Sequence, residues 1–172
     1  MTMPREMETE RLILRQLRES DLDAFAEICA DPQVMRFMGE FRPLDRMETW
    51  RVIATHLGHW QLRGYGMWAV EEKATGKLIG RVGLWNPEGW PELEVGWMLH
   101  RAYWGRGFAS EAGRASMDAA FRVLGVKHLV SVIHPENTAS IRLAERLGET
   151  FERTWVFRGL EVQVYGLHRS GA

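Results

Sequence analysis

Two glycines separated by one residue stand where a strand pattern changes into a helix pattern. Gly105 and Gly107 follow the apolar run 92–99, and the helical pattern covers 105–124. Glycine lets the backbone turn tightly and bring its N–H groups against a ligand, and a helix start adds about half a positive charge. The segment therefore suits a pyrophosphate group, although a glycine pair here can also be a simple strand-to-helix turn.

Two other phosphate-binding loops fit this segment less well. A P-loop requires Gly-Lys-Ser/Thr after its second glycine, whereas Gly107 is followed by Phe108 and Ala109. A dinucleotide-binding loop follows an early parallel strand and needs an acidic residue at the end of the next strand. Here the next predicted strand ends in Val132-Ile133-His134. Neither alternative accounts for the glycine pair.

Other reactive side chains lack the partners that catalysis requires. Cys29 is the single cysteine, and it lies in an apolar helical pattern with Phe25, where packing explains it and no base is evident. His56 and His59 lie three residues apart on a predicted helix without a third ligand candidate nearby. We therefore expect no metal site.

The elements that position the glycine pair follow from hydrophobic periodicity and turn residues. Strands are predicted at 11–16, 67–72, 77–86, 92–99, 127–133, 151–157 and 160–167, and helices at 20–29, 46–62, 105–124 and 137–147. Ser20 and Asp23 have the spacing of a capping box at the first helix. We expect one α/β domain over residues 1–172, with a mixed, mostly antiparallel central sheet of about seven strands flanked by about four helices.

Composition limits the partners. The 172 residues are 45% hydrophobic and 26% charged, and 22 Lys and Arg nearly balance 23 Asp and Glu. This balance leaves no bulk attraction for nucleic acid or an anionic membrane. The first residues lack the apolar run of a signal peptide, and no stretch approaches a membrane span. We expect a cytoplasmic protein without nucleic-acid or membrane partners.

The glycine segment resembles the acyl-CoA pyrophosphate loop of GNAT acetyltransferases, Gln/Arg-x-x-Gly-x-Gly/Ala, with 104–109 in register. The run Tyr-Trp-Gly-Arg-Gly-Phe-Ala-Ser-Glu-Ala is similar to the Rim type, the ribosomal-protein alanine N-acetyltransferases. Further similarities lie at 10–15, 94–97 and 137–140, so the resemblance covers nearly the whole chain. Trp104 departs from the general Gln/Arg position, as is common in the Rim type.

The resemblance implies the GNAT fold and acetyl-CoA as cosubstrate. Backbone groups of Trp97, Met98 and Leu99 would pair with the pantetheine arm like an added strand. The Asn137 side chain would hydrogen-bond the pantetheine, cap its own helix, or do both. The residues implied around the pyrophosphate are Trp104, Gly105, Arg106, Gly107, Phe108, Ala109 and Ser110. Arg101 is a further candidate for the nucleotide phosphates, with ordinary solvation as the alternative.

The implied chemistry is direct attack of a neutral amine on the thioester while both substrates are bound. Glu94 shares a strand face with Met98, so we expect it to be the base if that face borders the cleft; a structural ion pair is the alternative. The tyrosine that acts as acid in many members is replaced by Ala144. Ser140, one turn earlier, is the acid that the Rim type suggests, with a hydrogen bond near the helix start as its alternative.

The free energy needed to deprotonate an amine indicates which amine accepts the acetyl group. At neutral pH an α-amino group costs about 1 kcal/mol and a lysine roughly 4.6 kcal/mol. We therefore expect acetyl transfer to a peptide or protein N-terminus or to a small amine. A catalytically silent CoA-binding sensor and an antibiotic-modifying acetyltransferase remain alternatives. Related proteins are often dimers, which leaves a homodimer open.

Overall fold

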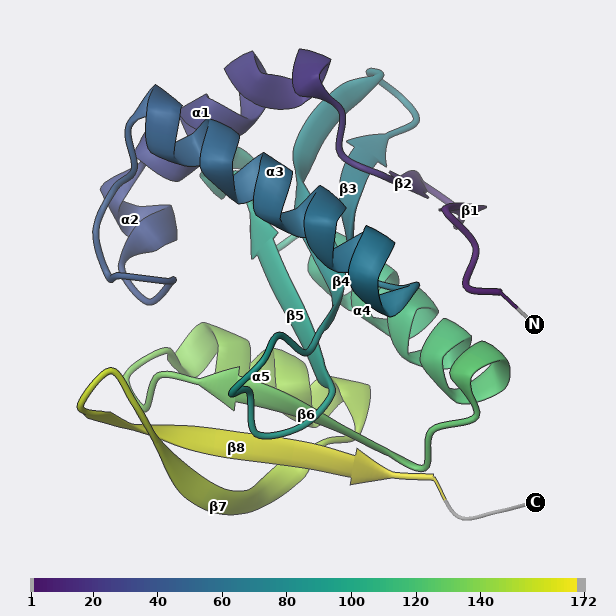
Figure 1. The fold of residues 1–172 in the computed structure, drawn as a ribbon, viewed down its shortest axis with the longest axis vertical. Coiled ribbons are helices and arrows are strands. Elements are labelled where there is room, and N and C mark those ends of the chain that lie inside the picture. The colour runs from purple at the N-terminus through teal and green to yellow at the C-terminus, as the bar shows by residue number, and fades with distance from the viewer. Residues whose placement is uncertain (1, 170–172) are drawn as a thin grey trace.

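The computed structural model describes residues 2–169, which form an eight-stranded sheet with helices on both faces (Figure 1). The strand order is β1-β2-β3-β4-β5-β6-β8-β7. The strands are β1 (Glu6–Glu8), β2 (Leu12–Arg15), β3 (Met67–Glu72), β4 (Lys77–Trp85), β5 (Glu94–Leu99), β6 (His128–Ile133), β7 (Thr150–Phe157) and β8 (Leu160–His168). The α-helices are α1 (Leu22–Ala30), α2 (Pro32–Met35), α3 (Arg46–Arg63), α4 (Phe108–Ala119) and α5 (Thr138–Leu147).

The predicted α/β class with a mostly antiparallel sheet is confirmed. The structure differs from the prediction at two short elements and at the start of the first helix. Strand β1 and helix α2 were not predicted because three and four residues carry too little periodicity. The capping box of Ser20 and Asp23 is wrong: the N-cap of α1 is Asp21. Its carboxylate instead accepts hydrogen bonds from the Arg18 backbone N–H and from the Arg15 guanidinium.

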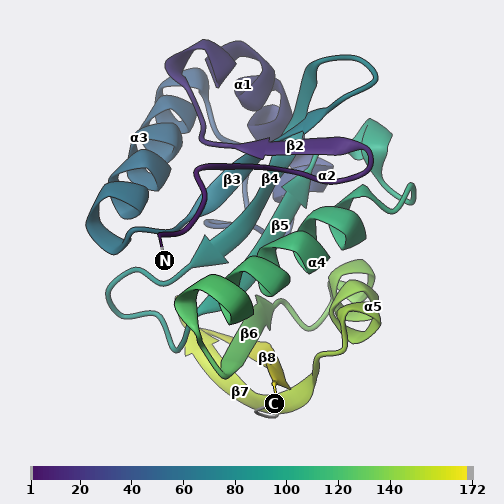
Figure 2. The same cartoon turned by 90° about the vertical axis from the view of Figure 1, so that its right-hand side faces the viewer.

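Two apolar clusters fill the space between the sheet and its helices. Helices α4 and α5 cover one face, where Phe108 and Leu147 join the larger cluster. Helices α1 and α3 lie across the other face, where Phe25 and Ile53 pack against Met98 of β5 (Figure 2). Strand β5 therefore separates the two layers. No helix in residues 2–169 is both long and apolar enough to span a bilayer.

The sheet is split between β5 and β6. Strand β5 pairs with β4 from Glu94 to Leu99, but its parallel pairing with β6 is limited to Glu94 opposite Val130. The Val130 N–H donates to the Leu93 carbonyl at 3.0 Å at the start of this contact. Beyond it the two strands run apart at a wide angle (Figure 1). One edge of β5 is therefore left without a strand partner along 95–99.

Candidate active site

Two cavities meet where β5 and β6 part. The smaller, about 390 Å³, extends from the split to α3, and the larger, about 740 Å³, extends to the start of α4. Glu94 lines the smaller cavity, and the glycine loop lines the larger. Five residues border both cavities: Phe37, Met38, Trp97, Asn137 and Ser140. A ligand in one cavity can therefore reach a ligand in the other at Trp97 and Ser140.

The glycine loop presents backbone amides to the larger cavity. Gly105 and Gly107 have φ of +70° and +78°, a conformation that strains other residues. Helix α4 begins at Phe108 rather than at Gly105, and the Glu111 N–H makes its first backbone bond, to the Gly107 carbonyl. The N–H groups of 108–110 precede that bond and are free for an anion.

Most of the predicted cofactor-binding residues lie together. The larger cavity is lined by Trp97, Met98, Leu99, Trp104, Gly105, Gly107, Phe108, Ala109, Ser110 and Asn137. The indole N–H of Trp104 donates to the Leu99 carbonyl at 2.9 Å, so this carbonyl is less available to a ligand. Two of the predicted residues, Arg101 and Arg106, are absent from the lining.

The two arginines predicted near the phosphates are engaged elsewhere. The Arg106 side chain lies over the Tyr103 and Phe108 rings and is 3.4 Å from a Glu72 carboxylate oxygen. Arg101 pairs with Asp31 at 3.1 Å. Two other arginines, Arg36 and Arg146, line the larger cavity. They lie outside the glycine motif, so the motif could not identify them.

Thr9 and Arg11, between β1 and β2, hold the glycine loop through Glu111, and we call these contacts the clamp. Arg11 donates from Nε to a Glu111 oxygen at 2.7 Å and from Nη1 to the Arg106 carbonyl at 2.9 Å. Glu111 also accepts hydrogen bonds from Thr9 Oγ1 and the Arg11 backbone N–H. The Arg11 guanidinium stacks 4.3 Å above the centre of the Phe108 ring. The loop conformation therefore depends on residues about a hundred positions away.

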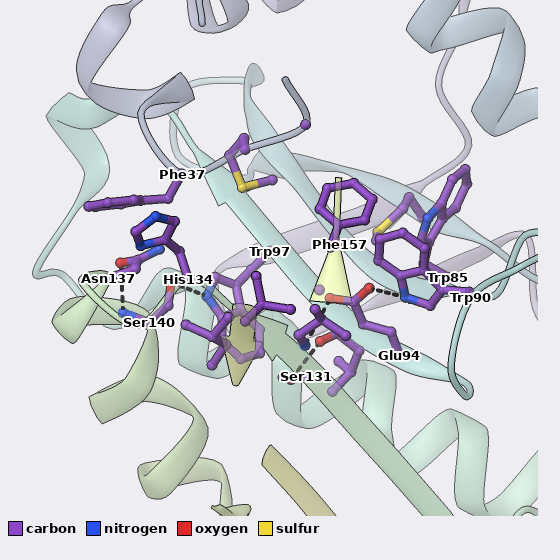
Figure 3. A pocket seen from close by; sticks show the side chains of 18 of the residues that line it. Phe37, Trp85, Trp90, Glu94, Trp97, Ser131, His134, Asn137, Ser140 and Phe157 are labelled. Atoms are coloured by element: carbon purple, nitrogen blue, oxygen red, sulfur yellow. Dashed lines mark hydrogen bonds between the residues drawn. The ribbon is translucent and has the colours of Figure 1, made fainter. Parts of the chain in front are cut away.

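Glu94 lies in the smaller cavity, as its predicted role requires (Figure 3). Its carboxylate accepts hydrogen bonds from Trp90 Nε1 at 2.7 Å and from the Val132 N–H at 3.3 Å. Burial raises its pKa to about 7, because removal from water disfavours the charged form more than these donors and Arg81 favour it. A carboxyl that titrates near neutral pH can both take up and release a proton.

A second buried carboxyl lies behind Glu94. Ser131 Oγ is 2.7 Å from the Val95 carbonyl and 3.1 Å from Glu149 Oε1. A hydroxyl has one hydrogen, so a protonated Glu149 satisfies both contacts by donating to Ser131 while Ser131 donates to Val95. Burial raises the pKa of Glu149 to about 8, and the Glu94 charge contributes to the shift. Neither Ser131 nor Glu149 was identified from the sequence, because neither lies in a motif.

Ser140 lies at the junction of the cavities. Trp97 Nε1 donates to Ser140 Oγ at 3.1 Å across the split, which leaves the hydroxyl hydrogen of Ser140 free (Figure 3). Asn137 Oδ1 accepts a hydrogen bond from the Ser140 N–H at 3.2 Å, so the N-cap alternative for Asn137 is confirmed. Ala144 is fully buried with Ile133 and Tyr165. Ser140 alone of these α5 residues combines a free hydroxyl with both cavities.

One group of side chains in residues 2–169 could offer three metal ligands: His128, Glu152 and His168. The two imidazole rings are stacked with centroids 3.9 Å apart and planes 9° from parallel. Lone pairs in parallel planes cannot converge on one ion. His128 also contacts Glu92 at 2.6 Å, in a network that includes Arg153. We therefore assign this group to ion pairing between strands.

Comparison with known proteins gives these features a family context. A family model described as an acetyltransferase (GNAT) domain matches residues 11–150. The N-acetyltransferase p20 of Bacillus licheniformis is 31% identical over 156 residues, which are 89% of this chain and 85% of p20.

Solved structures show the same fold. The crystal structure of an acetyltransferase from Agrobacterium tumefaciens has 35% identity and a TM-score of 0.86, covering 98% of this chain and 96% of that one. The ribosomal α-N-protein acetyltransferase RimL in complex with coenzyme A has a TM-score of 0.78 at 20% identity, covering 98% of each chain. At that identity the likeness to RimL shows the fold alone.

The Glu149→Gln variant tests the buried carboxyl. A carboxyl whose pKa is raised by folding stabilises the protein below its unfolded pKa, and this contribution is lost as the pH rises through about 8. We expect the free energy of unfolding to fall between about pH 5 and 8, with a slope shallower by roughly 1.4 kcal/mol per pH unit in Glu149→Gln. Urea denaturation at several pH values measures this, with the exposed Glu161→Gln as control. An unchanged slope in Glu149→Gln would contradict the assignment.

The Arg11→Ala variant tests the clamp. Loss of the hydrogen bonds to Glu111 and the Arg106 carbonyl should loosen the glycine loop and weaken coenzyme A binding about fivefold to tenfold, a modest loss because Arg11 is partly exposed. Calorimetric titration measures the Kd. Arg42→Ala serves as control, because Arg42 is also a partly exposed arginine paired with carboxylates, Glu40 and Glu48, but it makes no hydrogen bond to the glycine loop. Equal affinities for Arg11→Ala and Arg42→Ala would refute the clamp.

Proposed function

The chain belongs to the GNAT acetyltransferase family and is therefore an acetyl-CoA-dependent N-acetyltransferase; we propose that its acceptor is a small amine or a peptide N-terminal α-amine, bound in the smaller cavity. Acetyl-CoA would bind in the larger cavity. One observation carries the proposal: the cavity with the buried base and the cavity with the glycine loop meet at Trp97 and Ser140. This arrangement supports direct transfer while both substrates are bound.

In the proposed cofactor site, the start of α4 and the free edge of β5 offer backbone groups at two places along the larger cavity. The amides of 108–110 and the start of α4 would bind the pyrophosphate, with Arg36 and Arg146 as nearby cations. The free edge of β5 at Trp97 and Met98 would hold the pantetheine arm, which places the thioester at the junction. Asn137 combines its capping role with a position on the cavity wall.

Glu94 is the proposed base. The amine nitrogen attacks the thioester carbon, and ionised Glu94 takes the proton that the nitrogen loses, directly or through water. Each Glu94 oxygen accepts one hydrogen bond from the protein and has a second lone pair for this proton. With a pKa of about 7, a large part of the Glu94 population is ionised at neutral pH.

Ser140 is the proposed acid. As the carbon–sulfur bond breaks, the Ser140 hydroxyl donates to the leaving sulfur and its proton is replaced from solvent. The Trp97 indole N–H, which donates to the same oxygen, stabilises negative charge there and makes the hydroxyl a better donor. The products are the N-acetylated amine and coenzyme A with a free thiol.

The charges of the smaller cavity argue against the antibiotic-modifying alternative. Aminoglycosides carry several ammonium groups and need an acidic site. The cavity wall contains two arginines, Arg81 and Arg158, against one carboxyl, Glu94. A base with a pKa of about 7 also fits an α-amine better than a lysine, whose deprotonation costs roughly 4.6 kcal/mol at neutral pH.

Free-thiol release with acetyl-CoA tests the function. The acceptors are peptides beginning with Ala or Ser, small amines, amino acids and an aminoglycoside, with calorimetry for coenzyme A in parallel. Release with a small amine, an amino acid or a peptide supports the proposal. Tight coenzyme A binding without release on any acceptor would favour the sensor alternative, and absence of binding would refute the cofactor site.

The Glu94→Gln variant should lower kcat about a hundredfold to a thousandfold, because an amide cannot accept the proton. For the wild type, kcat/KM should rise with pH through an inflection near 7, since the base must be ionised. In Glu94→Gln, only the rise caused by the acceptor amine should remain. Identical pH profiles for both proteins would remove Glu94 from the base role.

The Ser140→Ala variant separates chemistry from binding. We expect kcat to fall roughly tenfold to a hundredfold, with little change in the Kd of coenzyme A. The Trp97→Phe variant, which removes the indole donor to Ser140, should show a smaller loss of kcat in the same direction. A Ser140→Ala enzyme with unchanged kcat would show that the leaving thiolate needs no acid from this position.

A further inference from the structure

Arg81 is a largely buried cation that faces the smaller cavity without an ionic partner. It lies on β4, opposite Ala69 of β3 and Met98 of β5, and both of these residues belong to the core under α1 and α3. Its Nε is buried and has no hydrogen-bond partner, and no ion pair to Arg81 occurs within residues 2–169. An unpaired charge in such a place costs several kcal/mol unless something compensates it.

Arg15, which is more deeply buried than Arg81, shows how carboxylates can satisfy such a charge in this chain. Arg15 is 7% exposed and donates to both oxygens of Asp21 at 2.8 Å and to Glu71 at 2.9 Å. Arg81 has no such carboxylates. The difference indicates that the partner of Arg81 comes from outside the chain.

Glu94 does not fill that role. It is the one carboxyl among the described residues that line the smaller cavity, and its oxygens already accept hydrogen bonds from Trp90 and Val132. No ion pair joins it to Arg81, and its pKa stays raised although Arg81 lowers it. Glu94 must also be free to exchange a proton in the proposed reaction.

His56, which lines the same cavity, provides a second unsatisfied donor just behind the cavity wall. It is 5% exposed, neither ring nitrogen has a partner, and its ring meets Trp85 edge-on with centroids 4.9 Å apart. Burial and the Arg81 charge hold its pKa well below the usual value, so the ring is neutral with one N–H to donate. A guanidinium and an imidazole N–H together suit a carboxylate.

From these contacts we propose that the acceptor is an amine that carries a carboxylate, which Arg81 binds with support from His56. This inference rests on the proposed function. Arg81 and the proposed base Glu94 line the same cavity of about 390 Å³, so a carboxylate on Arg81 and an amine at Glu94 fit within one small molecule. Amine and carboxylate are then separated by few bonds, as in an amino acid. The aromatic side chains of Phe37, Trp85, Trp90 and Phe157 would surround its apolar part.

Matched acceptors test this without any mutation. Phenylalanine, methionine and 4-aminobutyrate are each compared with their carboxamides in the thiol-release assay. We expect a kcat/KM at least about tenfold higher for one or more carboxylates than for the matching amide. The amine of each amide is less basic than the amine of the matching acid, because it lacks the nearby carboxylate charge, so a larger fraction of it is neutral at pH 7.5. Amine protonation therefore cannot produce a preference for the carboxylate.

Two substitutions of Arg81 test whether this residue causes the preference for carboxylates over amides. Arg81→Met should lower the ratio of kcat/KM for the preferred carboxylate to kcat/KM for its amide at least about tenfold, mainly through the KM of the carboxylate. The ratio is the readout because loss of Arg81 also raises the pKa of Glu94, which slows transfer to both acceptors alike. Arg81→Lys, which keeps the charge but not the planar fork, should lie between Arg81→Met and the wild type. Thermal melting of both variants checks that they fold.

The outcomes separate this inference from the proposed function. Equal or faster transfer to the amides in the wild type would overturn the role of Arg81 and leave the acetyltransferase proposal intact. If a folded Arg81→Met variant keeps the preference for the carboxylate, the role of Arg81 is overturned too. Transfer to no amine would overturn the proposed function, and this inference with it.

Discussion

The parting of β5 and β6 after one cross-strand pair is the constraint on which the site depends. Where two strands separate, their backbone groups lose ladder partners that must be replaced. Side chains replace them here: the Ser131 hydroxyl donates to the Val95 carbonyl, and Glu94 accepts from the Val132 N–H. Ser131 and Glu94 therefore satisfy backbone groups at the split, and Glu94 brings a buried carboxyl to the cleft. Beyond them, the β5 edge is free for a ligand and Trp97 reaches Ser140.

The site holds charge and polarity that a core selected only for stability would avoid. Glu94 and Glu149 are buried carboxyls with raised pKa values, and the buried His56 ring and the buried Nε of Arg81 have no hydrogen-bond partners. At neutral pH each feature destabilises the protein when no ligand is bound, and each lies in or beside the smaller cavity. Natural proteins depart from satisfied packing mostly at functional sites. The concentration of these departures on one side of the split supports acceptor binding and proton transfer there.

Local patterns predicted much of the fold and the segment that lines the larger cavity at the start of α4. The strand 67–72 and the helix 46–62 have strong periodicity and agree with the structure to within a residue, and the glycine pair lies at the cavity its motif implied. The rest depends on contacts between distant segments. Arg11 meets Glu111 only after folding, and the pKa of Glu149 is raised only because folding buries its carboxyl. Arg106 looked like a phosphate ligand, yet its neighbours Tyr103 and Phe108 hold it elsewhere.

The central claim is that coenzyme A occupies the larger cavity with its sulfur at the junction between Trp97 and Ser140. A crystal structure of the complex with coenzyme A tests this most directly. The account predicts the pyrophosphate on the amides of 108–110, the pantetheine arm along the free edge of β5, and the sulfur within hydrogen-bonding reach of Ser140 Oγ. A sulfur that lies away from this junction, with the smaller cavity unconnected to it, would contradict the account.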